Sequence, residues 1–415
     1  MARSAPPDTR YLGIDLHKDY LVIGGVTADQ AVVLQPRRFS FEAWAAWSKA
    51  HLRKSDVLVV EATSNTWTFY DGVVDLVARV EVANANKVTW IAGTDVKTDR
   101  LDVMKLARLC AAHLIPQVWV PPQPVRELRA LFSHRRRLVK ISTLVKNRLQ
   151  SLLHRHQIKA PSGDLYGEAN REWWIALGVS DTERLHIRHD FANLRLVQQQ
   201  LEEVDLELQR VSNTEPWAST LPFLIQIPGI GLLSALAILA AIGDISRFDE
   251  DRSLVGYSGL GARVHDSGST HRTGRITKSG RRDLRFALVE AARAAVRYDP
   301  YWAAVAARLG SRIGEKKALV AIARRLLVTI WHVLTKHEAD LHAEPERVAA
   351  KFMRWSWKLK PQHRQNLQSR HFIRLKLMSL KMGRDLTHLT YGKMPRRIAT
   401  VDELLKERPD VRPTA

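Results

Sequence analysis

The sequence is poor in cysteine, in long apolar runs and in negative charge. The single cysteine, Cys110, excludes an internal disulfide and a zinc site built from cysteines, and we expect it to be a small buried residue. No run approaches the ~18 uninterrupted apolar residues that a membrane helix needs, so we expect no membrane association. Residues 1–7 lack the apolar core of a secretory signal, and the expected compartment is cytoplasmic.

Acidic residues are outnumbered by basic ones, with 43 Asp and Glu against 64 Lys and Arg, which gives a net charge of +21. Because 45% of the residues are hydrophobic, the chain is expected to fold, and its 415 residues suffice for two or three domains. A folded protein of this charge is expected to bind a polyanion, with nucleic acid first.

The positive charge is concentrated from Lys351 onward, where 16 Lys and Arg stand against 5 Asp and Glu. Aromatic residues among bases suit nucleic acid whose bases stack on rings. The alternative is a partly ordered extension with only non-specific affinity. The aromatic residues concerned are Trp355, Trp357, Phe372 and Tyr391.

The first hundred residues predict a mixed sheet with helices on its faces. Apolar runs predict strands over 11–17, 21–26, 31–34, 56–62 and 88–91, and helical patterns are found at 41–52 and 67–80. Two of the strands end on an acid, Asp15 and Glu61. Ligands gather at the carboxyl ends of strands in open α/β sheets.

A further pair of acids, Asp99 and Asp102, stands in a helical pattern that extends to Leu109. Positions i and i+3 share a helix face, so the two carboxylates can hold a hard cation such as Mg²⁺. The alternative is that they cap the helix N-terminus. Together with Asp15 and Glu61, they supply the four carboxylates that a two-metal phosphoryl-transfer site requires.

The middle of the chain is predicted to be helical. A proline-rich linker at 118–124 precedes a basic helix at 125–157, whose arginines are expected to contact phosphate. Apolar residues from Leu194 to Val211 repeat at heptad spacing, so this segment pairs with the basic helix or with another protomer. The arginines are Arg135, Arg136 and Arg137.

Two features mark the region after residue 220. The sequence Pro228-Gly-Ile-Gly231 between helical segments resembles a helix-hairpin-helix, whose amides receive a phosphate, or it is a plain turn. Ser267 precedes a cluster of bases that includes Arg272, Arg275 and Lys278. A serine becomes a nucleophile only when it is activated, and these bases would supply the positive field; otherwise Ser267 is a turn residue.

These pieces resemble the DEDD transposases of bacterial insertion sequences, the insertion-sequence-110 family of bridge-RNA-guided recombinases, to which the Piv-type DNA invertases are related. The resemblance covers roughly residues 10 to 335. Its most specific motifs are Lys97-Thr-Asp99-Arg-Leu-Asp102, and Ser267-Gly268 followed by Lys278-Ser-Gly280 and Leu284-Arg285. Asn86 is followed by Lys87, where the family often has Asn-Pro.

The family implies an α/β plus α chain. An N-terminal RNase H-like (RuvC-like) mixed sheet would occupy 8–118, a helical coiled-coil region 119–218, and a mainly helical transposase domain 219–340. A basic extension at 341–415 would follow as an addition to the family pattern.

The resemblance also implies the site residues. Asp15, Glu61, Asp99 and Asp102 are similar to the catalytic acids that hold Mg²⁺, and Ser267 is similar to the nucleophile, although Ser258 and Ser269 lie near it. The implied activity is RNA-guided DNA transposition through a phosphoserine intermediate. The implied partners are donor and target DNA, a bridge RNA, and further copies in a homodimer or tetramer. Nucleic-acid contacts are expected from Arg135, Arg136, Arg137, Arg272, Arg275, Lys278, Arg281 and Arg285.

Two other functions remain open. In a hydrolytic RuvC-like (Holliday-junction-type) nuclease, the acids would activate water and Ser267 would be a turn residue. In a non-catalytic nucleic-acid-binding protein, the acids would only balance charge.

Overall fold

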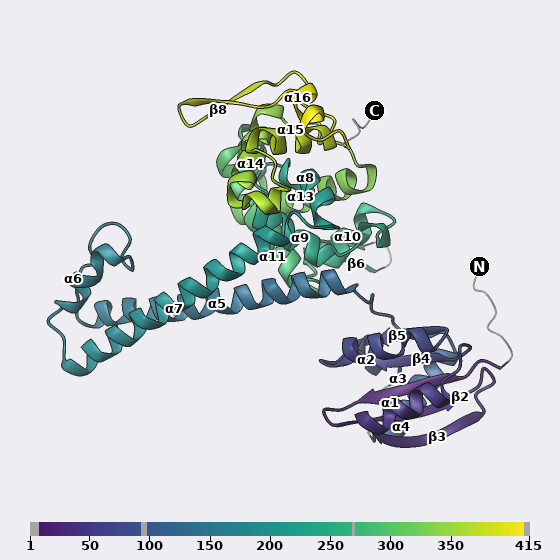
Figure 1. The fold of residues 1–415 in the computed structure, drawn as a ribbon. Helices are drawn as coiled ribbons and strands as arrows, with labels where there is room; N and C mark the ends of the chain where they lie inside the picture. The colour runs from purple at the N-terminus through teal and green to yellow at the C-terminus, as the bar shows by residue number, and fades with distance from the viewer. Residues whose placement is uncertain (1–7, 93–97, 268–269, 411–415) are drawn as a thin grey trace. The chain divides into compact units, whose positions relative to one another are not determined.

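The computed structural model describes residues 8–92, 98–267 and 270–410 (Figure 1). The chain divides into two compact units after Pro121. Each unit is described separately below.

The first unit is built on a five-stranded mixed sheet of order β3-β2-β1-β4-β5. The first three strands form an antiparallel meander, and the last two run parallel to β1. The expected mixed sheet is thereby confirmed. The strands are β1 (Tyr11–Leu16), β2 (Tyr20–Val26), β3 (Val32–Ser40), β4 (Val57–Glu61) and β5 (Arg79–Ala83), and the helices are α1 (Phe41–His51), α2 (Thr66–Val73), α3 (Ala85–Ala92) and α4 (Asp99–Ala111).

One predicted strand is wrong. Residues 88–91 lie in α3, and the fifth strand is β5, which begins inside the predicted helix 67–80. A short apolar run fits a strand and a buried helix equally well. The side chain of Asn84 decides between them, because it accepts a hydrogen bond from the amide of Lys87 at 3.3 Å and starts the helix.

The two faces of the sheet carry separate cores. Alternate residues such as Leu12 and Ile14 pack with α1 and α2, while Tyr11 on the opposite face packs with α4, where Cys110 is buried as expected. Helix α4 lies directly on β1, since a Cβ at Gly13 would stand 1.9 Å from the carbonyl oxygen of Val103. Glycine at this position brings the start of α4 to the end of β1.

The second unit begins with a long antiparallel helix pair (Figure 1). The predicted basic helix is α5 (Gln123–Arg155), and the heptad segment belongs to α7 (Asp181–Val211). Val197, Val204 and Leu208 of the heptad are buried, and the two helices contact each other within the chain. The connection between the two helices includes the short helix α6 (Arg171–Ile175).

Eight elements form the body that follows. Helices α8, α10, α11 and α12 pack against α13, α9 packs on α8 and α11, and β6 and β7 pair as a hairpin. These elements are α8 (Trp217–Ile225), α9 (Leu232–Ile242), α10 (Asp251–Ser258), β6 (Ala262–Ser267), β7 (Thr270–Ile276), α11 (Arg282–Tyr298), α12 (Pro300–Ile313) and α13 (Glu315–Lys336). Among the described helices, α13 has the length and apolarity to cross a membrane, but it packs within this helical body, where Ile322, Leu326 and Ile330 are buried.

The Pro-Gly-Ile-Gly turn joins α8 to α9 as expected. Two of its amides are already used, because Ile230 donates to the carbonyl of Ile227 at 3.1 Å and Gly231 donates to the hydroxyl of Ser234 at 2.9 Å. A Cβ at Gly229 would stand 2.1 Å from the carbonyl oxygen of Ala291 in α11. These contacts favour a packed helix–helix turn over a phosphate-binding one.

The basic extension is folded. It consists of α14 (Pro345–Lys358), α15 (Ser369–Ser379), β8 (His388–Tyr391), β9 (Met394–Arg397) and α16 (Val401–Glu407). Trp355 and Phe372 are each 1% exposed, so the expectation that they stack on bases is wrong. Trp357 remains 49% exposed.

Candidate active site

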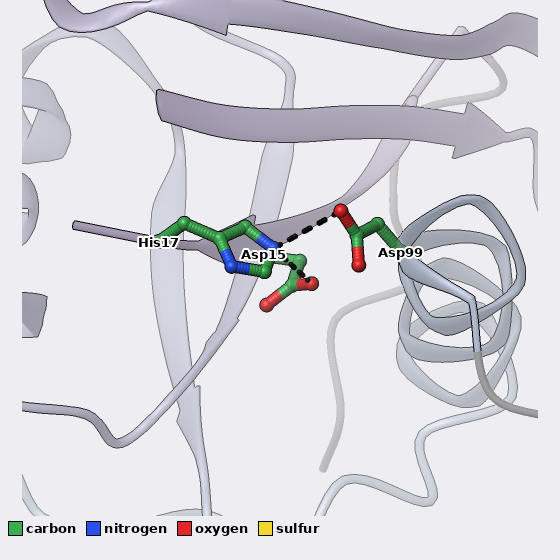
Figure 2. Close-up of side chains that lie close together, drawn as sticks. All are labelled: Asp15, His17 and Asp99. Carbon is green, nitrogen blue, oxygen red and sulfur yellow. Dashed lines mark hydrogen bonds and ion pairs between the residues drawn. The ribbon is translucent and has the colours of Figure 1, made fainter. Parts of the chain in front are cut away.

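Three side chains meet at the carboxyl end of β1: Asp15, His17 and Asp99 (Figure 2). One candidate ligand atom from each lies within 4.8 Å of the others. The Nε2 atom of His17 stands 3.0 Å from Asp15 Oδ2 and 3.2 Å from Asp99 Oδ2. The imidazole therefore bridges an acid of the sheet to an acid of helix α4.

The fold accounts for this meeting. Asp15 follows Gly13 by two residues on β1 and so points to the same face, which α4 covers. Asp99 is the first residue of α4, but the N-cap is Thr98, whose hydroxyl accepts from the amide of Leu101 at 3.3 Å. The carboxylate of Asp99 is therefore not needed as a cap and is directed to the cluster.

Tyr20 of β2 holds Asp99 from the other side. Its hydroxyl donates to Asp99 Oδ2 at 3.1 Å, and its ring stacks on His17 with centroids 4.3 Å apart. The guanidinium of Arg38 lies 3.4 Å from the ring centroid. Partial burial, and then the bond to Asp99, raises the pKa of Tyr20, so the hydroxyl is a donor at neutral pH.

The electrostatics of Asp15 favour a bound cation. Burial raises the pKa of Asp15, and the carboxylates of Asp99 and Asp102 raise it further, against a lowering by His17. Like charges held together at the end of a strand are stabilised by a divalent cation, for which carboxylate oxygens are suitable ligands. The donor set therefore fits a metal ion.

Glu61 and Asp102 lie near this cluster without joining it. Within the described residues, the set whose ligand atoms fall within 4.8 Å contains neither. Glu61 ends β4 directly after Val60, the partner of Ile14, so Glu61 and Asp15 end neighbouring parallel strands. Asp102 lies one turn after Asp99 and pairs with Lys105 at 3.4 Å. The catalytic roles of these four acids remain predictions.

His17, Tyr20 and Arg38 were not predicted as site residues. The only sequence signal for His17 is its position two residues after Asp15, at the end of a strand. Tyr20 and Arg38 come from β2 and β3 and reach the site only through the pairing of these strands, in which Val22 is paired with Arg38.

Ser267 is exposed at the end of β6, where it is paired with Thr270. Ser269 lies outside the described residues. Ser258 is buried at the end of α10, and its hydroxyl donates to the carbonyl of Val255 at 2.8 Å. Of the two described serines, Ser267 is thus the one that a DNA strand can reach.

The bases around Ser267 divide into two groups. Arg281 pairs with Asp283 at 2.5 Å, and Arg285 donates to the carbonyl of Ser258 at 2.8 Å, so both support the fold. Arg275 and Lys278 are exposed on β7 and in the turn after it. Arg272 lies on β7, opposite His265.

The basic helix α5 shows the same division. Arg135 donates to both carboxylate oxygens of Asp205 in α7, with distances of 2.7 and 3.3 Å, and so joins the helix pair. Arg136 and Arg137 are exposed. If this helix contacts phosphate, these two are the better placed to do so.

Comparison with known proteins identifies the family. Residues 12–158 match a DEDD domain of IS110-type elements described as "Transposase", and residues 222–307 match "Transposase IS116/IS110/IS902 family". The chain belongs to the IS110 family of transposases. The matched segments include the acid cluster and Ser267, and a DEDD transposase domain implies a DNA-cutting enzyme that uses a divalent metal.

Curated relatives of this IS110-family transposase span most of its length. The transposase for insertion sequence element IS1111A of Coxiella burnetii is 25% identical over 346 residues, 81% of this chain and 92% of the relative. The pilin gene-inverting protein of Moraxella bovis is 26% identical over 346 residues, 79% of this chain and 96% of the relative. The family predicted from the sequence motifs is therefore confirmed.

Proposed function

We propose that this transposase is an RNA-guided DNA recombinase that cuts and rejoins strands through a phosphoserine at Ser267. The observation that carries the proposal is the convergence of Asp15, His17 and Asp99 in a strongly basic chain of a transposase family. The exposure of Ser267 supports the proposed phosphoserine intermediate.

The proposed chemistry conserves the energy of the DNA phosphodiester. The Oγ atom of Ser267 bonds to phosphorus while the bond from phosphorus to the departing DNA oxygen breaks. The serine proton leaves to a base or to water, and the departing oxygen takes up a proton and becomes a hydroxyl. A hydroxyl from a second strand then attacks the phosphoserine, which releases Ser267 and joins the new pair of strands.

The acids have a positioning and electrostatic role in this scheme. Asp15 and Asp99 would hold Mg²⁺, and Glu61 and Asp102 would complete the set. The bound ion would stabilise the negative charge that develops on the phosphate oxygens. His17 fixes the two central carboxylates relative to each other, and Arg275 and Lys278, with Arg272, steady the phosphate near the serine.

The partners follow from the same proposal. Donor and target DNA are the substrates, a bridge RNA from the element specifies both, and the protein works as a dimer or tetramer. The acids and Ser267 belong to different compact units of the chain, which is compatible with a site completed across protomers.

The test of the serine step is a covalent adduct. Wild-type protein incubated with donor DNA, the element's RNA and Mg²⁺ should form a protein–DNA adduct that survives denaturation. Ser267→Ala should form none, while Ser279→Ala, which removes an exposed hydroxyl twelve residues away, should form it normally. A persistent adduct in Ser267→Ala would refute the serine role.

A hydrolytic nuclease is the second candidate, and the location of the acid cluster within one compact unit favours it. Nicking that survives Ser267→Ala but is lost in Asp102→Ala would establish hydrolysis. Absence of any Mg²⁺-dependent cleavage would instead support a binding protein. Sequencing of RNA that copurifies with the protein would identify the guide. RNase treatment should abolish site-specific cleavage if the guide is required.

A further inference from the structure

The basic extension is hydrogen-bonded to the helical body. Arg374 is fully buried and donates to the carbonyls of Ala399 at 2.6 Å and Gly383 at 2.7 Å. Lys376 donates to the carbonyl of Ala218 in α8 at 3.0 Å, and Lys351 donates to those of Ile225 and Ile227. A buried cation is tolerated only when it is hydrogen-bonded in this way. The extension is therefore folded as an integral part of the second unit.

The aromatic residues of the extension serve two purposes. Trp355 and Phe372 form its core, with ring centroids 5.1 Å apart. Trp357 and Tyr391 instead meet edge to face at the surface, with centroids 5.1 Å apart and an interplanar angle of 89°. Figure 1 shows the β8–β9 hairpin projecting from the helices, and Leu389, 2% exposed, is the residue of β8 that is buried at its base.

Bases surround this aromatic pair. Arg354 and Lys358 are exposed on α14 and stand on the same side as Trp357 by their spacing. Lys393 lies at the hairpin turn, and Arg396 is the cross-strand partner of Leu389. No residue from 388 to 397 is acidic. We call this surface the hairpin face: Arg354, Trp357, Lys358, Tyr391, Lys393 and Arg396.

The hairpin is not suited to pairing with another strand. Pro395 removes one main-chain donor from β9, and the amide of Thr390 in β8 already donates to Glu346 at 3.0 Å. A protein strand added to either edge would therefore lose main-chain hydrogen bonds. The side chains of the hairpin face are the groups left to make contacts.

We propose that the hairpin face binds an unpaired DNA strand, with a base stacked on Trp357 and phosphates on Arg354, Lys393 and Arg396. The ring of Tyr391 stands at right angles to the indole, and Trp357, 49% exposed, keeps accessible surface for a base. Only an unpaired base presents its π-face, so single strands are bound better than duplex. DNA is favoured because a transposase exposes DNA strands when it cuts. The proposal does not depend on Ser267 being the nucleophile.

The test uses the full-length protein and labelled oligo(dT) in fluorescence anisotropy. Trp357→Ala should weaken binding by about tenfold, the effect of removing one stacked base. Trp357→Phe should retain most of the affinity, and Lys393→Ala with Arg396→Ala should reduce the salt dependence. Tyr298→Ala, which removes an exposed tyrosine from α11, is the matched control. Unchanged thermal unfolding shows that the variants fold.

Cross-linking locates the contact independently of other basic surfaces. An oligonucleotide carrying 5-iododeoxyuridine should cross-link to Trp357 or Tyr391 in the wild type and in Ser267→Ala, whatever the outcome of the adduct test. Cross-links only elsewhere, with no loss of affinity in Trp357→Ala, would overturn the proposal. Equal affinity for duplex DNA, or tenfold tighter binding of oligo(U), would overturn the assignment to single-stranded DNA.

Discussion

Charged side chains are withdrawn from solvent in the C-terminal extension and at the carboxyl end of β1, and their partners differ. In the extension, Arg374 and Lys376 are buried and Lys351 is partly buried, and each donates to main-chain carbonyl oxygens. At the end of β1, Asp15 and Asp99 share the imidazole of His17, and the pKa of Asp15 is raised by burial and by its acidic neighbours. Burial disfavours the charge in both places, but the cations are hydrogen-bonded to the backbone, whereas the two acids also disfavour each other, as is typical of groups that bind a ligand.

The largest effect is expected from Asp15→Asn. DNA cleavage should fall by roughly 10³-fold or more, since a proposed ligand of the catalytic ion is lost. The metal-free protein should unfold at a higher temperature, because the variant removes a charge that burial and its neighbours disfavour. Asp29→Asn, a change of an exposed acid in a turn, is the control. A lower melting temperature for Asp15→Asn would show that the carboxylate is structural.

Tyr20→Phe tests how Asp99 is positioned. It keeps the ring between His17 and Arg38 but removes the 3.1 Å bond to Asp99. Loss of a group that orients a ligand typically lowers metal affinity by about 10- to 100-fold. Calorimetric titration with Mg²⁺ and Mn²⁺ measures this affinity. Tyr70→Phe, the same change at a partly buried residue packed against the apolar core, is the control. Equal metal affinities for the wild type, Tyr20→Phe and Tyr70→Phe would show that Tyr20 does not position Asp99 for metal binding.

Gly13→Ala tests the approach of α4 to β1. The added methyl group would stand 1.9 Å from Val103 O, so the helix must shift, at a cost of about 1–3 kcal/mol. The free energy of unfolding in urea should fall accordingly. Gly72→Ala adds a methyl group with no atom within 4 Å and should not destabilise the protein. An equal loss in both variants would point to a general effect of glycine replacement.

Lys351→Met should change the slope of stability against pH, which is the smallest of these effects when counted per pH unit. Burial lowers the pKa of Lys351 to about 7 from its ordinary 10.5, so between these values the unfolded chain binds more protons than the folded one. Stability should therefore rise with pH across this window, by at most about 1.4 kcal/mol per unit. The rise should shrink in Lys351→Met and persist in Lys393→Met. An unchanged slope in Lys351→Met would mean that its ammonium stays charged.

The sequence predicted the parts of the fold that follow from local pattern. The strands that end at Asp15 and Glu61, the helix α5 and the heptad of α7 were found because their apolar periodicity is long or bounded by clear breaks. The fifth strand was misplaced because residues 79–83 and 88–91 have similar short apolar patterns. Only the cap at Asn84 separates them.

The candidate site was predicted only in part, for a related reason. Asp15 and Asp99 carry chemistry that is recognisable in isolation. Tyr20 and Arg38 are ordinary surface residue types in the sequence, and they become part of the site through the pairing of β1, β2 and β3. The burial of Trp355 and Phe372 also depends on tertiary packing, which composition does not reveal.

The most direct test of the account is to map the covalent adduct by mass spectrometry. Protein trapped on donor DNA with its RNA and Mg²⁺ should yield, after nuclease and protease digestion, a peptide with a phosphodeoxynucleotide on Ser267. The adduct should be absent when Asp15 or Asp99 is replaced. An adduct on another residue, or Mg²⁺-dependent cleavage without any adduct, would contradict the proposed mechanism.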